Sequence, residues 1–320
     1  MNTNATTTSK SKALGLHLFV IAALIGLFSV LPEYHSGIIA RVLILAIYAM
    51  GYNLLFGYTG LLSLGHALFF ASGMYGLGLA MQYWHVSPVI GLIAGLGLAA
   101  IVSAVIGFLA LRTAGVAFMI VTLMFAQAGY LTILLLGKYT RGDEGFVIKQ
   151  SQRMIAGFDL THATNRYYVS VFLFAICLLI IGWIVQSSFG KTLVAIRENE
   201  ERARMLGYNV QMHKWLAVII SGTMSGGAGA AYALLFGYVG GTFATVQYSI
   251  FPLLYVLLGG AGTTVGPLIG ALFMFYLIDI SSQFTSAYLL VAGVALILLT
   301  LFAPQGLAGI LRKRVMRWLP

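Results

Sequence analysis

The 320-residue sequence has little charge and few of the residues that build catalytic or metal sites. Asp, Glu, Lys and Arg together make up 8% of it, and its one cysteine, Cys177, cannot form a disulfide within the chain. The sequence lacks an H-E-x-x-H zinc motif, a G-x-S-x-G nucleophile elbow and the Lys-Ser/Thr of a phosphate-binding P-loop. We therefore expect no enzyme, no cofactor and no metal site. Any energy for pumping must come from a partner.

Hydrophobic residues make up 60% of the chain, and the mean hydropathy is +0.95. Apolar runs recur near the ~20 residues that a helix needs to cross a bilayer. The stretch Tyr248–Asp279 is interrupted by several glycines and Pro267, which we expect to divide it into two spans. The prediction is an all-α, polytopic transmembrane helix bundle of about ten spans with interrupted helices. The eight plain runs are Ala13–Leu31, Ile38–Phe56, Ser63–Tyr83, Val89–Leu111, Gly115–Leu136, Tyr168–Gln186, Trp215–Gly237 and Tyr288–Phe302.

The basic residues indicate the orientation, because positively charged loops tend to stay in the cytoplasm. With ten spans and a cytoplasmic N-terminus, most of the 18 Lys and Arg residues fall inside. The net charge of +10 then mostly reflects the topology of the chain in the membrane. We expect membrane lipid around the helices and no nucleic-acid partner. The predicted units are a cytoplasmic tail over 1–12, a transmembrane domain over 13–302 and a basic cytoplasmic tail over 303–320. An outer loop over 137–167 and a cytoplasmic loop over 187–214 interrupt the transmembrane domain.

Two heptads nearly repeat, "LLFGYTG" at Leu54–Gly60 and "LLFGYVG" at Leu234–Gly240. In the ten-span arrangement they lie at opposite ends of spans 2 and 7, as a five-plus-five inverted repeat requires. Chance is the alternative, since Leu, Phe and Gly are abundant. Each copy leads into a glycine-rich break, over 57–66 and 237–245. Broken helices at membrane depth expose backbone groups suited to a small polar solute, although small-residue helix packing also explains single glycines.

The first break supplies candidate residues for a translocation pathway. They are Thr59, Gly60, Ser63, Gly65 and His66. Thr59 and Ser63 carry hydroxyl groups that could bind a solute or water. We predict a neutral, structural His66, because no acidic residue nearby in sequence could offset the cost of burying its charge. Direct contact with the substrate is the alternative.

Ionisable residues inside the spans are scarce. Arg41 and Asp279 lie near outer ends, and neither is placed as a midplane ion or proton site. A carrier driven by protons or sodium usually needs buried acids along its path. A stand-alone channel or ion-coupled carrier is therefore the less favoured alternative.

The cytoplasmic loop holds a charged segment between two apolar spans. "KTLVAIREN" and "EERARML" each suit a short helix, with Asn199 as a cap between them and Gly207 as a stop. Ala203 and Leu206 can form a small apolar face, which fits docking to a protein surface. A solvated loop that only fixes topology is the alternative, but it leaves the acidic residues unexplained. The charged candidates for this docking contact are Arg197, Glu198, Glu200, Glu201 and Arg202.

The sequence resembles the membrane permeases of bacterial branched-chain amino-acid ABC importers, and is more similar to the longer of the two paired permease types. The resemblance covers most of the chain from Ala40 to Gly309. It rests on "GYTGLLSLGHALFFASGMYG", "FGKTLVAIRENEERARMLGYNV", "GGAGTTVGPLIGA" and "FAPQGLAG". It implies a bacterial inner-membrane location, a second related permease, two cytoplasmic ATP-binding subunits and an external solute-binding protein. It also implies that the cytoplasmic loop couples to the ATPase, with Glu201, Ala203 and Gly207 matching the core of the coupling motif.

The outer loop departs from that family's pattern. Related permeases commonly carry a Thr-Gly-Gly-x-Asp-Gly-like run after the fifth span, whereas this chain has "TRGDEG" at Thr140–Gly145. Arg141 stands in place of a glycine, and the acid is shifted or doubled. The expected function is a permease subunit for branched-chain or similar small amino acids. Urea and short amides, which the same family transports, remain alternative substrates.

Overall fold

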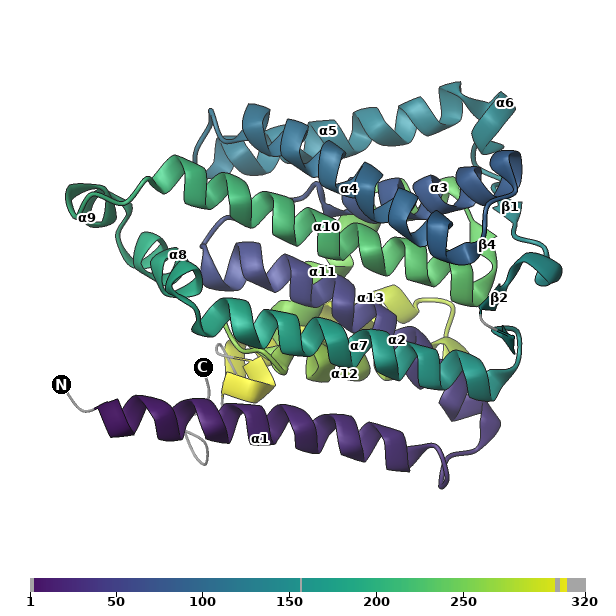
Figure 1. Ribbon diagram of the computed structural model, residues 1–320, viewed down its shortest axis with the longest axis horizontal. Helices are drawn as coiled ribbons and strands as arrows, with labels where there is room; N and C mark the ends of the chain where they lie inside the picture. The colour runs from purple at the N-terminus through teal and green to yellow at the C-terminus, as the bar shows by residue number, and fades with distance from the viewer. Residues whose placement is uncertain (1–2, 156, 303–305, 310–320) are drawn as a thin grey trace.

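A computed structural model of the chain describes residues 3–155, 157–302 and 306–309. It is a bundle of long helices that lie side by side along one direction (Figure 1). The long helices are α1 (Thr3–Leu27), α2 (Glu33–Asn53), α3 (His66–Trp84), α4 (Pro88–Ala110), α5 (Val116–Leu135), α7 (Ala163–Gln186), α10 (Val210–Phe236), α11 (Val246–Gly259), α12 (Gly266–Phe284) and α13 (Tyr288–Phe302).

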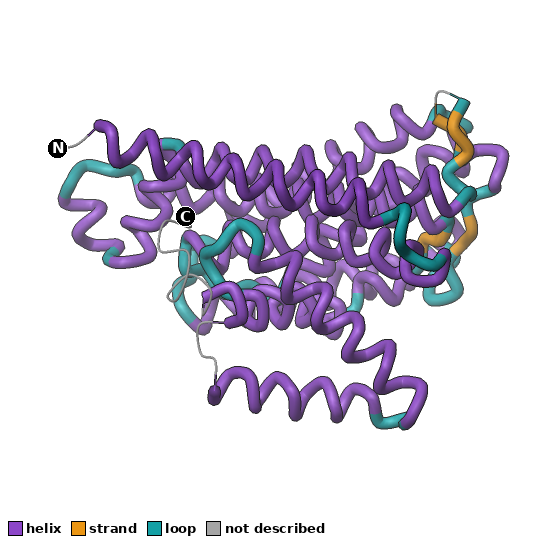
Figure 2. The backbone as a smooth tube through the Cα atoms, turned by 90° about the horizontal axis from the view of Figure 1, so that it is seen from below, coloured by secondary structure: helices purple, strands orange, loops and turns teal. Residues whose placement is uncertain are grey.

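Short elements close the two ends of the bundle. The helices α8 (Ser188–Glu198) and α9 (Glu200–Met205) lie at one end, and the short strands lie at the other (Figures 1 and 2). β1 pairs with β4 and β2 with β3, both antiparallel. The remaining short elements are the π turn η1 (Leu54–Tyr58), α6 (Gly137–Thr140), the 3-10 turns η2 (Gln150–Gln152) and η3 (Gly241–Ala244), and the strands β1 (Phe146–Val147), β2 (Met154–Ile155), β3 (Phe158–Asp159) and β4 (Tyr238–Val239).

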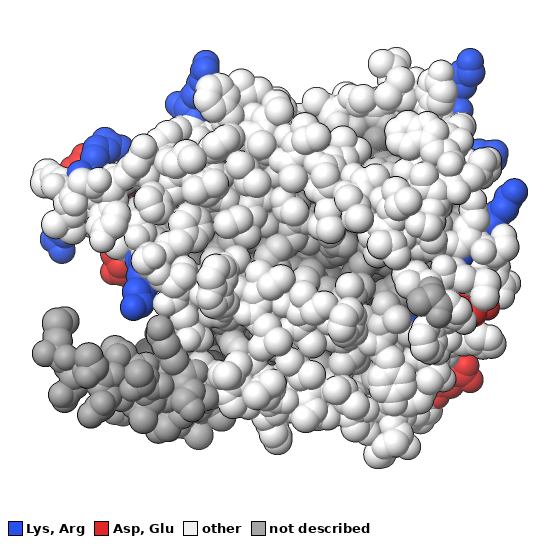
Figure 3. Space-filling view, in the orientation of Figure 1, with Lys and Arg blue, Asp and Glu red and all other residues white. Residues whose placement is uncertain are grey.

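The lengths and the surface of the helices are typical of a membrane protein. Among the residues that the structure describes, six helical stretches are long and apolar enough to cross a bilayer. Charged atoms gather at the two ends of the face shown in Figure 3, and the middle of that face carries almost none. The chain is therefore an all-α, polytopic membrane protein, while the count of about ten spans stays a prediction. The six stretches are Glu33–Tyr58, Pro88–Ala110, Val116–Leu135, Ala163–Gln186, Val210–Phe236 and Gly266–Phe284.

The glycines near residue 260 divide the ambiguous apolar stretch as predicted. Helix α11 ends at Gly259, and α12 begins at Gly266 with Pro267 in its first turn. Proline suits a first turn because the amide that it lacks would have no partner there. The intervening residues 260–265 are called the α11–α12 break below.

Small residues bring the central helices into backbone contact. A Cβ on Gly73 of α3 would collide with the backbone of Gly226 on α10, and one on Gly95 of α4 would meet the backbone of Gly73 at 2.6 Å. Such close approach is typical of membrane helices. Helix α2 lies innermost. In the most apolar 18 residues of Glu33–Tyr58, 94% are buried, whereas the corresponding share for α5 is 17%. One side of α5 is thus left uncovered by this chain.

The two similar heptads lie at opposite ends of the bundle. Leu54–Gly60 lies at the same end of the bundle as the predicted cytoplasmic loop, and Leu234–Gly240 includes β4 at the end that holds the predicted outer loop. The two loops keep the names of these predicted sides below. This arrangement is what an inverted repeat requires, but the repeat itself stays a prediction. Helix α1 already begins within the predicted N-terminal tail. The predicted basic tail over 303–320 lies outside the described residues except for 306–309.

Candidate functional site

A buried amide joins the two breaks that lie nearest the cytoplasmic loop. Asn53 ends α2 and is 1% exposed. Its Nδ2 donates to the Thr263 carbonyl at 2.9 Å, and its Oδ1 accepts from the Gly262 amide at 2.9 Å. Asn53 thus satisfies a donor and an acceptor that the α11–α12 break would otherwise leave unpaired in the interior. Segments 210 residues apart in sequence are held together by this one side chain.

The cytoplasmic loop reaches the same place through Arg197, near the end of α8. Its Nη1 donates to the Gly57 carbonyl in the π turn. A Cβ added at Gly60 would lie 3.0 Å from Arg197 Cγ, and one added at Gly262 would lie 3.3 Å from Arg197 Nη1. A cation is favourable here because the carbonyls at a helix end lack intrahelical partners. We call Asn53, Gly57, Arg197, Gly262 and Thr263 the Arg197 junction.

Deeper in the bundle, His66 is the centre of a second polar network. It is fully buried, with Nε2 2.8 Å from Ser221 Oγ and Nδ1 3.2 Å from Ser63 Oγ. Ser221 Oγ donates to the Gly51 carbonyl at 2.6 Å, so it must accept from His66 Nε2–H. Nδ1 then carries a lone pair that accepts from Ser63. These contacts fit the predicted neutral ring and connect α2, α3 and α10.

This network predicts different outcomes for two replacements of His66. Glutamine can place an amide N–H near the position of Nε2 and keep the bond to Ser221, whereas leucine leaves Ser221 and Ser63 without their partner. Loss of a buried partner costs roughly 1–3 kcal/mol. We expect His66→Leu to lower the thermal transition of the purified protein well below that of His66→Gln, measured by fluorescence-detected thermal unfolding. Equal transitions would show that the bonds to the ring contribute nothing to stability.

The hydroxyl groups predicted to meet a solute are occupied within the chain. Thr59 is 3% exposed and donates to the Leu54 carbonyl at 2.9 Å, while Ser63 is 1% exposed and accepts from the Gly65 amide at 3.2 Å. Gly65 lies against the Thr122 backbone of α5, where a Cβ would lie 2.7 Å from the carbonyl oxygen. The five candidates are therefore brought together around the break, and their place on a pathway stays a prediction.

Residues of these networks that the sequence did not single out are Asn53, Ser221 and Thr263. An amide within an apolar run is a usable signal, because polar side chains inside membrane helices often mark functional positions. Asn53 could have been found in that way. Ser221 and Thr263 could not, since small hydroxyl residues are common where membrane helices pack.

The cytoplasmic loop folds into the two short helices that the sequence predicts. Asn199 separates them, and its Oδ1 accepts from the Arg202 amide at 2.8 Å as the N-cap of α9. Gly207 follows α9 with φ +86°, a left-handed conformation that glycine adopts without strain. The predicted cap and stop are both confirmed.

The apolar side of α9 differs from the prediction. Ala203 is 2% exposed and packs with Ile196 and Val210 of this chain, whereas Leu206 is 72% exposed. The expected face of Ala203 and Leu206 is wrong, because α9 turns Ala203 toward α8 and α10. The outward apolar residues are Met205, which is 84% exposed, and Leu206.

The charges of this loop divide into two groups. Glu200 is paired within the chain, with Oε1 3.2 Å from Arg204 Nη2 and Oε2 close to Lys214 Nζ. Glu201 is exposed and has no ion pair among the described residues. Glu198 and Arg202 are exposed as well. These three side chains, unlike Glu200, are free to contact another protein.

The outer loop is fastened to the second heptad. β1 pairs with β4, and buried Arg153 donates to the carbonyls of Leu234 and Leu235. Arg141 has φ +58°, a left-handed backbone conformation that favours glycine, at the position where the related motif has a glycine.

Asp159 of the outer loop is held by local hydrogen bonds. The Thr161 amide and hydroxyl both donate to its carboxylate and keep the pKa of Asp159 below its usual value.

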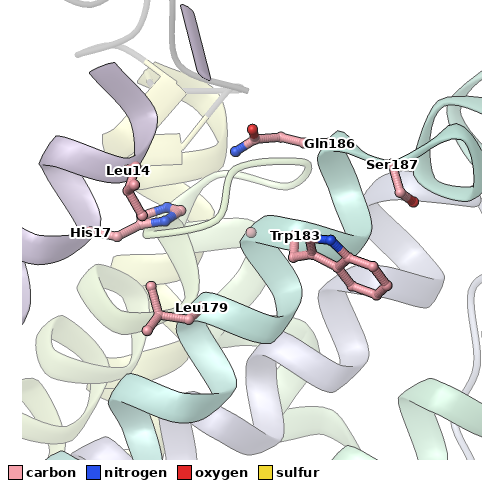
Figure 4. Close-up of a pocket in the computed structure, with 7 residues that line it drawn as sticks. Leu14, His17, Leu179, Trp183, Gln186 and Ser187 are labelled. Atoms are coloured by element: carbon pink, nitrogen blue, oxygen red, sulfur yellow. The ribbon is translucent and has the colours of Figure 1, made fainter. Parts of the chain in front are cut away.

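A pocket of about 440 Å³ lies between α1 and α7 (Figure 4). His17 is 2% exposed, and its Nε2 lies 2.9 Å from Thr264 Oγ1 in the α11–α12 break. Trp183, in contrast, is 74% exposed on the outside of the bundle. The pocket is thus an open groove rather than an enclosed solute chamber. No group of three or more His, Cys, Asp or Glu in the described part of the chain could hold a metal ion.

Known proteins resemble this chain along most of its length. The LivM permease protein of the high-affinity branched-chain amino acid transport system is 27% identical in Salmonella typhimurium and 28% identical in Escherichia coli K12, each over 300 residues. Each match covers 85% of this chain and 69% of the relative. A probable LivM of Methanocaldococcus jannaschii is 25% identical, covering 71% of this chain and 75% of that protein. No solved structure matches.

The family profile described as "Branched-chain amino acid transport system / permease component" matches residues 34–301. That range runs from the start of α2 almost to the end of α13, and it contains both the Arg197 junction and the His66 network. The chain belongs to the family of permease components of branched-chain amino acid transport systems.

Proposed function

We propose that this chain is one of two permease subunits in an ATP-driven importer of branched-chain or related small amino acids. Two separate cytoplasmic subunits hydrolyse ATP, and an external binding protein delivers the solute. The chain lies in the bacterial inner membrane with both termini in the cytoplasm. The names of the relatives support the substrate class. Urea and short amides are the alternative substrates.

The observation that carries this proposal is the Arg197 junction. A loop that served only as a topological anchor would have no need to contact the backbone at the ends of the membrane helices. Here α8 contacts the π turn through Arg197, and the same guanidinium lies beside Gly262. A movement of the loop on an ATPase subunit would therefore reach both breaks directly.

A carrier driven by ions alone fits less well. In the membrane helices that the structure describes, the acidic side chain farthest from a helix end is Asp279 of α12. It accepts hydrogen bonds from the Tyr34 hydroxyl at 3.0 and 3.1 Å and lies near the outer end. Such an acid offers no midplane ion site.

Copurification and competition test the proposal together. A tagged chain expressed with its neighbouring transport subunits should elute in mild detergent with a second permease and an ATPase. In reconstituted vesicles containing the binding protein, unlabelled leucine, isoleucine and valine should suppress uptake of labelled leucine, while urea should not. Uptake of labelled urea in place of labelled leucine would favour the alternative substrate, and solute transport by the lone chain would refute the importer assignment.

Charge reversal at Glu201 is expected to weaken docking of the ATPase. Glu201 is exposed and has no ion pair with any residue that the structure describes, so Glu201→Lys should leave the fold intact but change the sign of a contact at the partner surface. Breaking one side of a polar pair at an interface costs on the order of 2–5 kcal/mol. Pull-down of the ATPase should fall at least about tenfold. The matched control is Glu144→Lys in the outer loop, which should leave pull-down unchanged; equal binding by both variants would remove Glu201 from the contact.

A further inference from the structure

Helix α5 presents an exposed stripe with an amide in the middle of it. The residues at helical spacing along this side are Val116, Ile120, Met124, Gln127, Leu131 and Leu135. The five apolar members are between 44% and 86% exposed, and Gln127 is exposed too. The Gln127 amide has no hydrogen-bond partner among the described residues.

Gln127 lies near the centre of the bilayer. At 1.5 Å per residue it is about 16 Å from the start of α5 and about 12 Å from its end. The hydrocarbon core is about 30 Å thick, so the side chain is too short to reach either interface. An amide that faced lipid at this depth would lack any hydrogen-bond partner, which is strongly unfavourable.

The neighbouring helix α4 shows what a lipid-facing side of this protein looks like. Its exposed side chains are uniformly apolar and include Ile93, Ile101, Val105 and Phe108, with exposed fractions between 55% and 64%. The α5 stripe is equally exposed but differs by one central amide. The exposed fractions therefore do not distinguish the two faces, whereas the polar side chain in the middle of the α5 stripe does.

A second amide lies on an element that contacts α5. Helix α5 touches both η3 and α11, the segments that follow the second glycine-rich break. Gln247 is the second residue of α11, is exposed and also lacks a hydrogen-bond partner in the described part of the chain. Helix α11 has only 14 residues and is therefore about 20 Å long. With its C-terminal end at the Arg197 junction, its first turn does not reach the outer surface of the membrane.

We propose that the face formed by α5, η3 and α11 is the wall that this chain contributes to the solute path, opposite the second permease. Gln127 and Gln247 are its solute-contacting side chains. This inference rests on the proposed function, since it requires a second permease to close the path. The buried hydroxyls of Thr59 and Ser63 then support the break from behind rather than meeting the solute.

The chemistry of the two amides suits a zwitterionic amino acid. A glutamine side chain donates through its NH₂ group and accepts through its carbonyl oxygen, so it can bind a carboxylate or an ammonium group without carrying a charge of its own. Apolar neighbours such as Met124 and Leu131 offer contact to an aliphatic side chain.

Isosteric substitutions test the two amides. Gln127→Met and Gln247→Met keep the size of each side chain but remove its hydrogen bonds. Each should lower solute uptake at least about fivefold, and the double variant should lower it further, while the second permease and the ATPase still copurify with the chain. The matched control is Gln283→Met at the exposed outer end of α12, which should transport normally. Normal uptake by the double variant would overturn the assignment.

Cysteine labelling locates the face independently of transport. In a Cys177→Ser background, single cysteines replace Met124, Leu131 and, as the lipid-facing control, Ile101. In the assembled complex in vesicles, the cysteines at positions 124 and 131 should react with a water-soluble maleimide, and the cysteine at position 101 should not. In a separate measurement, a quencher dissolved in the lipid should lower the fluorescence only of a probe attached at position 101. Lipid quenching at Met124, or protection from both reagents, would overturn the assignment to a water-filled path. Failure of the unmodified chain to copurify with its partners would instead refute the proposed function.

Discussion

A complex that carries Arg197→Ala is expected to hydrolyse ATP at its basal rate while its solute uptake falls roughly 10- to 150-fold. The alanine variant loses the hydrogen bond from the guanidinium to the Gly57 carbonyl, which links the side chain of α8 to the π turn. A hydrogen bond that involves a charged group contributes about 1.5–3 kcal/mol, which corresponds to that range. Uptake and ATP hydrolysis should be measured in the same vesicles.

Two controls separate coupling from assembly. Lys191→Ala removes another exposed basic side chain from α8, one that makes no side-chain hydrogen bond or ion pair among the described residues, and it should transport normally. Pull-down of the ATPase by the Arg197→Ala variant should equal that of the unmodified chain, because the Arg197 guanidinium donates to Gly57 of this chain. If both activities fall in parallel with lost pull-down, Arg197 acts as a docking residue and not as a link to the breaks.

Gly270→Ala is expected to abolish the folded protein. Gly270 on α12 faces the backbone of α11, where a Cβ would collide with the Tyr255 carbonyl and lie 2.8 Å from the Gly259 amide nitrogen. The colliding atoms belong to the backbone and cannot move aside as a flexible side chain can. The loss of folding free energy should therefore exceed the roughly 1–3 kcal/mol typical of overpacking. The measurement is the amount of monodisperse protein recovered from membranes, which we expect to be negligible.

The matched control is Gly97→Ala on α4. Gly97 is also helical, but a Cβ there would have no atom within 4 Å. This variant should be recovered normally and gain about 0.5–1 kcal/mol from the lower flexibility of alanine in the unfolded chain. Equal recovery of the two variants would mean that α11 and α12 separate easily enough to accept a methyl group.

Local features of this fold were readable from the sequence because each depends on residues close together in the chain. The apolar runs predicted the long helices, the glycines after Gly259 predicted a break, and Asn199 and Gly207 predicted the ends of α9. Periodicity and capping act over a few residues, so no knowledge of the tertiary structure was needed.

The site could be predicted only in part, because its contacts join distant segments. Arg197 was a candidate for the loop, but its partner Gly57 is 140 residues away. Ala203 was expected to face outward, yet it packs against Val210 because α10 begins directly beside it. Which side of a short helix is buried depends on the helices around it, and no periodic pattern in six residues determines that.

The π turn at the end of α2 has a consequence for the length of the chain at this point. A π turn closes its hydrogen bonds over five residues instead of four, so it accommodates one residue more than an α-helical turn. Deleting a single residue from Leu54–Tyr58 would let this turn close as a regular α-helical turn. The carbonyls of the narrower turn would be placed differently, so the Gly57 carbonyl would lose the position in which it accepts from Arg197. The extra residue of this one turn is therefore what presents the Gly57 carbonyl to the loop.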